Sequence, residues 1–180
     1  VVLFAGRMER RKGIHLCPAI TAAVLERHEV AFVFAGRDLF GFLERTLLPA
    51  LRARPLRGTV HVLGALDLPR MRSWMHAADV VLLPSLWESC PYSCLEAMAA
   101  GRAILASDAG GLPELIDDSV SGLLAPSGDS AAFIERLERL LADPGLRQRL
   151  GAAARRAVET TFRATAIAAR SVAIYRRAAS

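Results

Sequence analysis

The chain has 180 residues, of which 53% are hydrophobic and 23% are charged, and its formal net charge is +5. A chain of this length can bury one sizeable hydrophobic core, and no stretch is typical of a linker between two domains. The positive charge suits nucleic acid, an anionic membrane surface or a phosphorylated ligand, and alone it selects none of them. No basic run is longer than residues 10–12 and only 6% of residues are aromatic, which argues against binding to nucleic acid.

Targeting and redox signals are also weak. The apolar runs are far shorter than the roughly 18 to 20 residues that a membrane span needs, and no signal-peptide pattern opens the chain. The three cysteines, Cys17, Cys90 and Cys94, lack zinc-type spacing and indicate reduced thiols. We therefore expect a soluble, cytoplasmic protein. Because Val1 already lies inside an apolar run, we also expect a fragment whose preceding segment is absent.

Short apolar segments alternate with helix-like segments along the chain. Strands are expected at residues 1–6, 30–36, 59–64, 79–84, 103–107 and 122–126. Helices are expected at residues 13–28, 40–54, 68–77, 93–100, 130–142, 144–161 and 163–178, with a short one near Pro113. Continuous apolar strands that alternate with helices predict an α/β fold, a Rossmann-like, doubly wound parallel sheet of about six strands with helices on both faces.

In such a sheet, ligands bind beyond the carboxyl ends of the strands. The first turn of this kind, residues 6–13, contains Arg7 and the only lysine of the chain, Lys12, and ends at Gly13. Two cations beside the N–H groups of a helix start suit a diphosphate, and the alternative is a solvated basic loop. Neither G-x-G-x-x-G after Gly6 nor G-x-x-x-x-G-K-[ST] occurs, which argues against an ordinary dinucleotide oxidoreductase or a P-loop NTPase.

Two glutamates, Glu88 and Glu96, have seven residues between them and flank the start of the helix expected at residues 93–100. The sequence S-C-L-E from Ser93 matches a capping box, which explains Glu96 as well as a functional role does. Glu88 follows Trp87 in a loop at the ligand edge and has no such local explanation. Its alternatives are a ligand contact and an exposed loop carboxylate.

Other reactive side chains give weaker signals. Cys94 lies in the first turn of the same helix, but no histidine is near it in sequence, and we expect a small buried hydrophobe rather than a nucleophile. His15 and His61 lie in apolar segments and are expected to be structural. Since the spacing of Asp and His gives no metal motif, a bound diphosphate would be neutralised by side chains and backbone. We expect no metal site and no cofactor.

Three segments together resemble one known family: GRMERRKG at residues 6–13, SLWESCPYSCLEAMAAGR at residues 85–102 and SDAGGLPE at residues 107–114. They resemble the carboxyl-terminal domain of GT-B-fold retaining glycosyltransferases, the "glycosyl transferases group 1" family, and the resemblance runs to about residue 175. It implies the donor-binding half of a retaining, metal-independent transferase, which moves a sugar from a UDP-, GDP- or ADP-sugar to a sugar, lipid or small-molecule acceptor. A nucleotide-binding module that is inactive when isolated, and a nucleotide-sugar epimerase, are the alternatives.

The resemblance also implies roles for four charged residues. Arg7 and Lys12 would hold the diphosphate and act as electrophilic catalysts, because fixed cations stabilise the charge on the departing group. Glu88 would contact hydroxyls of the donor sugar and favour the oxocarbenium-like centre, as a stabiliser or as a nucleophile. Glu96 would hydrogen-bond the ribose hydroxyls, so that both acids face one ligand.

The remaining implied contacts involve the backbone. Many family members have glycine where this chain has Pro91, and because proline has no N–H, we expect Tyr92 and Ser93 to supply amides instead. Leu63 and Gly64 would border the base. The residues implied to bind the nucleotide sugar are Gly6, Arg7, Lys12, Leu63, Gly64, Glu88, Tyr92, Ser93, Leu95 and Glu96, and those implied to be catalytic are Glu88, Arg7 and Lys12.

The end of the chain is expected to be a separate element. Residues 1–161 would form the nucleotide-sugar-binding domain, and the helix within residues 162–180 would pack toward the absent amino-terminal domain. One stripe of this helix carries Ile167, Ser171 and Ile174, with arginines opposite. The alternative is a peripheral helix on an anionic membrane, at its cytoplasmic face.

Overall fold

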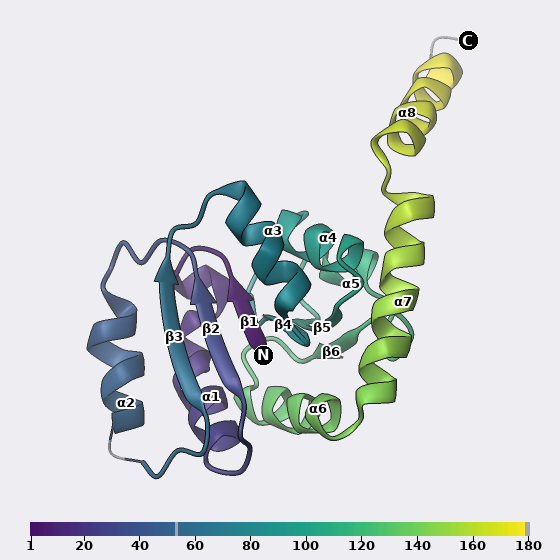
Figure 1. The fold of residues 1–180 in the computed structure, drawn as a ribbon. Coiled ribbons are helices and arrows are strands. Elements are labelled where there is room, and N and C mark those ends of the chain that lie inside the picture. The colour runs from purple at the N-terminus through teal and green to yellow at the C-terminus, as the bar shows by residue number, and fades with distance from the viewer. Residues whose placement is uncertain (53, 179–180) are drawn as a thin grey trace.

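The structure, a computed structural model, describes residues 1–52 and 54–178, and these form a six-stranded parallel sheet covered by helices (Figure 1). The strands are β1 (Val2–Ala5), β2 (Ala31–Ala35), β3 (Thr59–Gly64), β4 (Val80–Leu83), β5 (Ala103–Ser107) and β6 (Leu123–Ala125). Their order is β3-β2-β1-β4-β5-β6, and all neighbours are parallel. The predicted Rossmann-like α/β fold is confirmed.

The strands are continuously apolar because both faces of the sheet are covered. β1, β4 and β5 are buried along their whole length, whereas the edge strand β3 is half-buried or exposed throughout. In β2, Phe32 and Phe34 point into one core while Val33 and Ala35 point into the other, as the two-residue period of a strand requires. A one-residue slip in register would exchange these two sets, so the pattern specifies the pairing.

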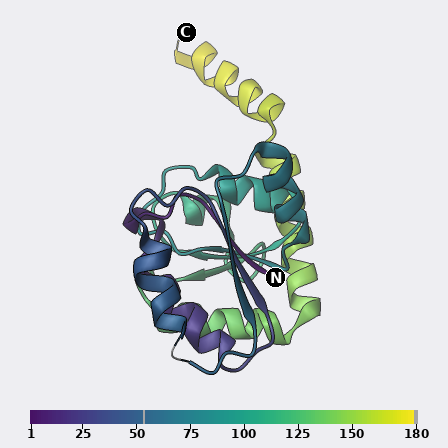
Figure 2. The ribbon, with the colours of Figure 1, turned by 60° about the vertical axis from the view of Figure 1, so that its left-hand side comes forward.

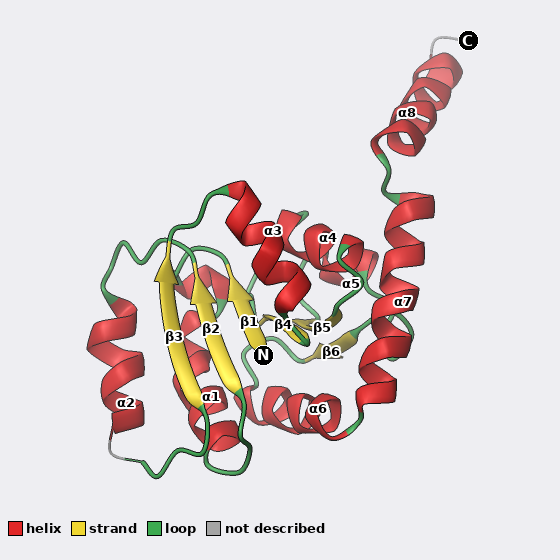
Figure 3. Cartoon of the chain, in the orientation of Figure 1, coloured by secondary structure: helices red, strands yellow, loops and turns green. Residues whose placement is uncertain are grey.

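Helices form a layer on each face of the sheet (Figure 3). The helices of the first layer are α1 (Cys17–Leu25), α2 (Leu48–Arg52) and α6 (Ser130–Ala142). The helices of the second layer are α3 (Leu68–Ala77), α4 (Tyr92–Ala99) and α5 (Leu112–Leu115). The long helix α7 (Pro144–Thr161) contributes Leu150 to the first core and Ala154 to the second, so it closes the sheet beside β6.

The helix expected at residues 13–28 begins later than predicted. Two short 3-10 turns, Arg10–Lys12 and Ile14–Leu16, precede α1 and are separated by Gly13. Gly13 has a φ of 73°, and a Cβ there would lie 1.7 Å from the carbonyl oxygen of Pro84. Only glycine allows both this conformation and this approach, so the first turn packs directly against the end of β4.

The helix expected at residues 40–54 also starts late, with a π-helical turn at Leu43–Leu47 that continues as α2. The Asp38 side chain explains this start, since it accepts hydrogen bonds from the N–H groups of Phe42 at 2.9 Å and Leu43 at 2.8 Å. Residue 53 of the predicted range lies outside the described residues. The helices predicted at residues 68–77, 130–142 and 144–161 have the predicted bounds.

The last helix, α8 (Ala164–Ala178), extends away from the domain, as two views of the ribbon show (Figures 1 and 2). None of the residues in this range is buried, and Ile174 and Tyr175 are 63% and 73% exposed. The predicted helix is therefore present, and its apolar side chains are largely exposed among the residues that the structure describes. Residues 179 and 180 of the predicted C-terminal segment lie outside the described residues.

Candidate functional site

The candidate site lies where the strand order changes direction. After β1 the chain builds β2 and β3 on one side, and then returns to place β4 on the other side of β1. The turns that follow β1 and β4 therefore diverge and leave a crevice, which is the ligand-binding position in open α/β sheets. They are joined by a hydrogen bond from the Leu86 N–H to the Arg11 carbonyl at 2.8 Å.

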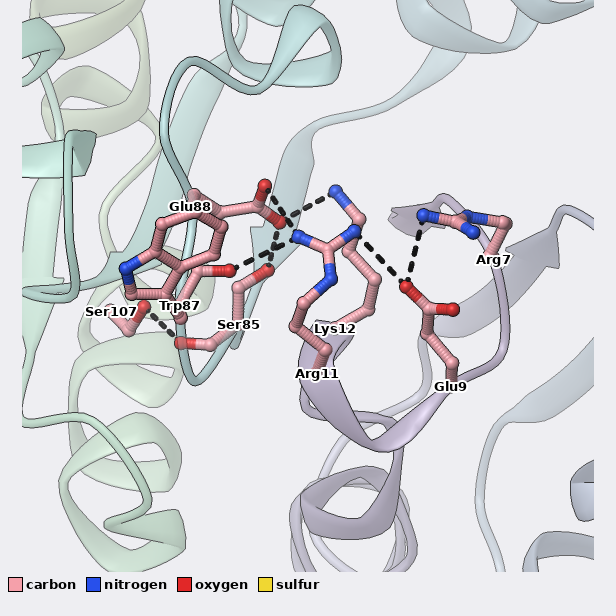
Figure 4. Close-up of polar contacts among 8 residues, drawn as sticks. All are labelled: Arg7, Glu9, Arg11, Lys12, Ser85, Trp87, Glu88 and Ser107. Carbon is pink, nitrogen blue, oxygen red and sulfur yellow. Dashed lines mark hydrogen bonds and ion pairs between the residues drawn. The ribbon is translucent and has the colours of Figure 1, made fainter.

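Glu88 is buried in this crevice and is only 5% exposed. Its Oε1 accepts hydrogen bonds from Lys12 Nζ at 2.5 Å and from Ser85 Oγ at 2.8 Å, and its Oε2 accepts one from Arg11 Nη1 at 3.3 Å (Figure 4). A buried carboxylate is tolerated only when it is paired and hydrogen-bonded, and this one has both. The alternative of an exposed loop carboxylate is wrong.

The charges continue through the first turn. Glu9 Oε1 lies 3.1 Å from Arg11 Nη2 and 3.2 Å from Arg7 Nη2. The residues of this charged cluster, which alternate in sign, are Arg7, Glu9, Arg11, Glu88 and Lys12. Sequence reasoning found Arg7, Lys12 and Glu88 and missed the other two. The signal that was present is the spacing of Arg7, Glu9 and Arg11 at every second position, with opposite charges alternating.

The loop that carries Glu88 is held from behind by the turn after β5. Ser107 Oγ donates a hydrogen bond to the Ser85 carbonyl at 2.5 Å (Figure 4). The Gly111 N–H donates one to the Glu88 carbonyl at 2.8 Å. Gly110 has a φ of 57°, and a Cβ there would lie 2.0 Å from the Glu88 carbonyl oxygen. The Asp-Ala-Gly-Gly turn therefore fixes the backbone of Glu88 by close contact.

The capping box predicted at Ser93 is wrong. Helix α4 begins at Tyr92, its N-cap is Pro91, and no side chain caps it. Pro91 adopts the extended conformation that an N-cap needs, and its carbonyl accepts the N–H of Cys94 at 3.0 Å. Ser93 is thus already the second helical residue, so its hydroxyl and Glu96 do not form the reciprocal pair. The N–H groups of Tyr92 and Ser93 lie in the first turn, where an α-helix leaves amides without a partner inside the helix.

Glu96 lies in a groove between α3 and α4, away from the charged cluster. The groove has a volume of about 260 Å³ and is lined by Leu68, Met71, Arg72, Met75, His76, Glu96, Ala99 and Ala100. Partial burial raises the pKa of Glu96, and the nearby cation of Arg72 opposes this shift. Because the capping box does not form, the neighbour that acts on this carboxylate within the groove is the Arg72 cation.

The other predicted contact residues lie along the same edge of the sheet. Gly6 follows β1, and a Cβ there would lie 3.9 Å from Cδ of Lys12, so the lysine stem passes beside it. Gly64 ends β3, and its carbonyl accepts the N–H of Gly36 at 2.8 Å. Leu63 and Leu95 are half-buried and pack against the second core. Gly6 thus lies beyond the end of β1, Leu63 and Gly64 lie at the end of β3, and Leu95 lies within α4.

Cys94 and His61, two other reactive side chains considered from the sequence, differ in their burial. Cys94 is fully buried, and burial raises the pKa of its thiol to about 12, so it is not a thiolate nucleophile at neutral pH. His61 is exposed on β3 and shares a hydrogen bond with Thr59 at 3.0 Å.

Within residues 1–52 and 54–178, no three His, Cys, Asp or Glu side chains gather as metal ligands do. None of the helices in this part of the chain is long and apolar enough to span a bilayer.

Comparison with known proteins identifies the class to which this fold and this site belong. The model of the family described as "Glycosyl transferases group 1" matches residues 1–143. The chain belongs to this family, and the resemblance inferred from its three sequence segments is confirmed.

Individual relatives agree. Alpha-maltose-1-phosphate synthase of Mycobacterium tuberculosis is 32% identical over 187 residues, which cover 98% of this chain and 48% of that protein. Sucrose-phosphate synthase from Thermosynechococcus elongatus superposes with a TM-score of 0.83 at 30% identity, over 99% of this chain and 46% of that one. HepE of Anabaena, in complex with UDP-glucose, superposes with a TM-score of 0.76 at 25% identity, over 88% and 43%. The chain thus spans a little under half the length of each of these three proteins.

Proposed function

We propose that this chain is the donor-binding half of a retaining glycosyltransferase, which transfers a sugar from a nucleoside diphosphate to a sugar, lipid or small-molecule acceptor. Membership of the family supports the transfer of a sugar. The complexes of HepE with UDP and with UDP-glucose support a nucleotide-sugar donor. The acceptor would be held largely by the part of the longer protein that lies beyond this chain.

The observation that carries the proposal is the charged cluster at the crevice between β1 and β4. Lys12 and Arg7 offer cations to a diphosphate, and in the proposed complex the first-turn amides of Tyr92 and Ser93 in α4 add hydrogen bonds to it. Glu88 offers the neighbouring sugar a carboxylate, and in the proposed complex Glu96 binds the ribose from the α3–α4 groove. Leu63 and Gly64 border the base, and Gly6 and Leu95 line the path between base and phosphates.

The chemistry follows from these charges. Cleavage of the bond between sugar and phosphate adds negative charge to the leaving diphosphate, so cations fixed beside it stabilise the transition state more than the ground state. The carboxylate of Glu88 accepts bonds from sugar hydroxyls and stabilises positive charge at the reacting carbon. In this proposal side chains and backbone supply the neutralisation, without a protein-held metal. Transfer that persists unchanged in excess EDTA is the expected result.

Calorimetric titration of the chain with UDP, GDP and ADP tests the binding step, with the nucleoside of the same base as the control that lacks the diphosphate. We expect one nucleotide to bind best and Lys12→Ala to weaken it by about 1.5 to 3 kcal/mol, the usual range for a charge-assisted hydrogen bond. Equal affinity for the nucleotide that binds best and for the nucleoside with the same base would refute the diphosphate site. The variant Glu96→Gln is titrated in the same way and its melting temperature is measured. Weaker nucleotide binding by a variant that is still folded indicates loss of the ribose contact.

The reaction itself is tested in the longer protein. Glu88→Ala is expected to abolish transfer, and unchanged transfer would remove its catalytic role. The isolated chain is expected to bind donor without turning it over, because it spans less than half of its relatives. Conversion of the donor in the absence of any acceptor would instead favour a nucleotide-sugar epimerase.

The exposed stripe of α8 is also part of this proposal. Its apolar side chains, Ile167 and Ile174 among them, pack toward the amino-terminal half of the longer protein. The alternative partner is the cytoplasmic face of an anionic membrane, since α8 carries arginines and no acidic residue. Flotation with vesicles of phosphatidylglycerol distinguishes the two: the longer protein stays unbound if α8 is covered, and floats if α8 lies on lipid.

A further inference from the structure

In the proposed complex, two anions compete for the Lys12 ammonium: the Glu88 carboxylate and the diphosphate of the donor. Its ammonium now donates to Glu88 Oε1 at 2.5 Å, and the Lys12 side chain is only 17% exposed. A diphosphate bound at the proposed site draws the same ammonium toward itself. Glu88, whose side chain is 6% exposed, would then lose one of its two cations while still buried. The donor therefore binds only if something else holds the carboxylate.

Arg11 is placed to do this. It contacts the other oxygen of Glu88, Oε2, at 3.3 Å, so it does not share an acceptor atom with Lys12. The same Nη1 lies 3.3 Å from the carbonyl oxygen of Trp87, and Nη2 donates to Glu9 Oε1 at 3.1 Å (Figure 4). The guanidinium is thus tied to two loops by three acceptors, and its planar fork keeps it there.

Arg11 lies between the two carboxylates of the charged cluster. Figure 4 shows its guanidinium between Glu9 and Glu88, with the Lys12 ammonium on the same side of the Glu88 carboxylate. Ser85 stays on Oε1 through its hydroxyl at 2.8 Å. When the Lys12 ammonium moves to the phosphate, Glu88 keeps one cation, Arg11, and one hydroxyl donor, Ser85.

We propose that Arg11 is a positioning residue: it holds the Glu88 carboxylate when Lys12 is released to the diphosphate of the donor. This inference rests on the proposed function. It predicts that Arg11 acts on nucleotide binding through Glu88, without contacting the phosphates. Arg11→Gln leaves Lys12 as the only cation on Glu88, so Lys12 is harder to release and UDP binds more weakly. Glu88→Gln frees Lys12, so UDP binds more tightly and Arg11 becomes irrelevant to its affinity.

A double-mutant cycle tests this on the chain as it is, with UDP as the probe and calorimetry as the measurement. Arg11→Gln is expected to weaken UDP about fivefold in the wild-type background and less than about twofold in the Glu88→Gln background. Arg10→Gln is the matched control, because Arg10 precedes Arg11, carries the same charge and is exposed. It is expected to change the affinity equally little in both backgrounds.

The outcomes are distinct. An equal loss from Arg11→Gln in both backgrounds would mean that Arg11 meets the phosphates directly, and no loss in either would mean that it has no role; each overturns the proposal. If wild-type chain binds none of UDP, GDP and ADP, the proposed donor site itself fails. Should Arg11→Gln lower the melting temperature, Arg11→Lys replaces it in the same cycle. That variant keeps the charge but cannot hold Glu9 and Glu88 together, and its loss must again depend on Glu88.

Discussion

The carboxylate of Glu88 lies 2.5 Å from the ammonium of Lys12, the only lysine of the chain, although 76 positions separate the two residues. The contact joins the turns after β1 and β4 across the topological switch point. It also pairs a buried acid with a mostly buried base at the carboxyl ends of these two strands. The stability of the domain and the chemistry of its site therefore depend on the same pair.

The first prediction concerns that stability. Lys12→Met is expected to lower the free energy of unfolding by about 1 to 3 kcal/mol, because it leaves Glu88 buried with one cation fewer. Adding Glu88→Gln to Lys12→Met should restore most of the loss, since the remaining group is then neutral. Urea denaturation of the two single variants and the double variant measures both effects. A double variant that is no more stable than Lys12→Met alone would contradict the explanation.

The second prediction concerns the reactivity of Lys12, the only lysine of the chain. Acetylation by a limiting amine reagent is expected to be slow at Lys12 in the wild type, because its ammonium is held by Glu88. It should be several times faster in Glu88→Gln, and slower again when UDP is added to either protein. Mass spectrometry of the labelled peptide gives the rate, and an added lysine-containing peptide of unfolded sequence serves as the reference. Equal rates in wild type and Glu88→Gln would show that the pair does not shield the lysine.

The third prediction concerns the turn behind Glu88. Gly110→Ala is expected to cost about 3 kcal/mol, because it adds a strained φ and a contact of 2.0 Å with the Glu88 carbonyl oxygen. Gly128→Ala is the matched control: its φ is 84°, but nothing lies within 4 Å of the added Cβ. It should cost only about 1 kcal/mol, the price of the conformation alone. Equal losses in the two variants would mean that the close approach to Glu88 is relieved without strain.

The sequence predicts helix bounds well where a short polar side chain caps the helix. The helices α3, α6 and α7 have the predicted bounds, and their N-caps are Asp67, Asp129 and Asp143, each of which accepts a backbone N–H from its own helix. Proline at the start of α3 and α7 adds a second signal. At α4 the same logic failed: the N-cap is Pro91, two residues before the expected Ser93, so the apparent capping box does not form.

The site was predicted only in part, for a different reason. The spacing of the two glutamates and the basic turn after β1 indicated a ligand site, and the structure brings Lys12 to Glu88. Which of the adjacent cations Arg10, Arg11 and Lys12 turn inward depends on the 3-10 turn that they form and on the left-handed Gly13 that ends it. The alternating charges of Arg7, Glu9 and Arg11 are visible in the sequence, but they do not show that Arg11 reaches Glu88, which only the structure gives.

The last prediction is a pH dependence at Glu96. Burial raises the pKa of this carboxyl in the folded chain, so folding favours its protonated form. Its contribution to stability is therefore largest below the unfolded value near 4.5, and it is lost as pH rises through the raised folded value. The variant Glu96→Gln does not lose stability in this way, because its side chain does not ionise. The melting temperature of the variant relative to wild type should increase between about pH 4 and about pH 7. If Glu96 holds the ribose, the same substitution should also weaken nucleotide binding. A difference in melting temperature that does not change with pH would mean that Glu96 titrates as a free carboxyl, and the groove between α3 and α4 would then impose no penalty on its charge.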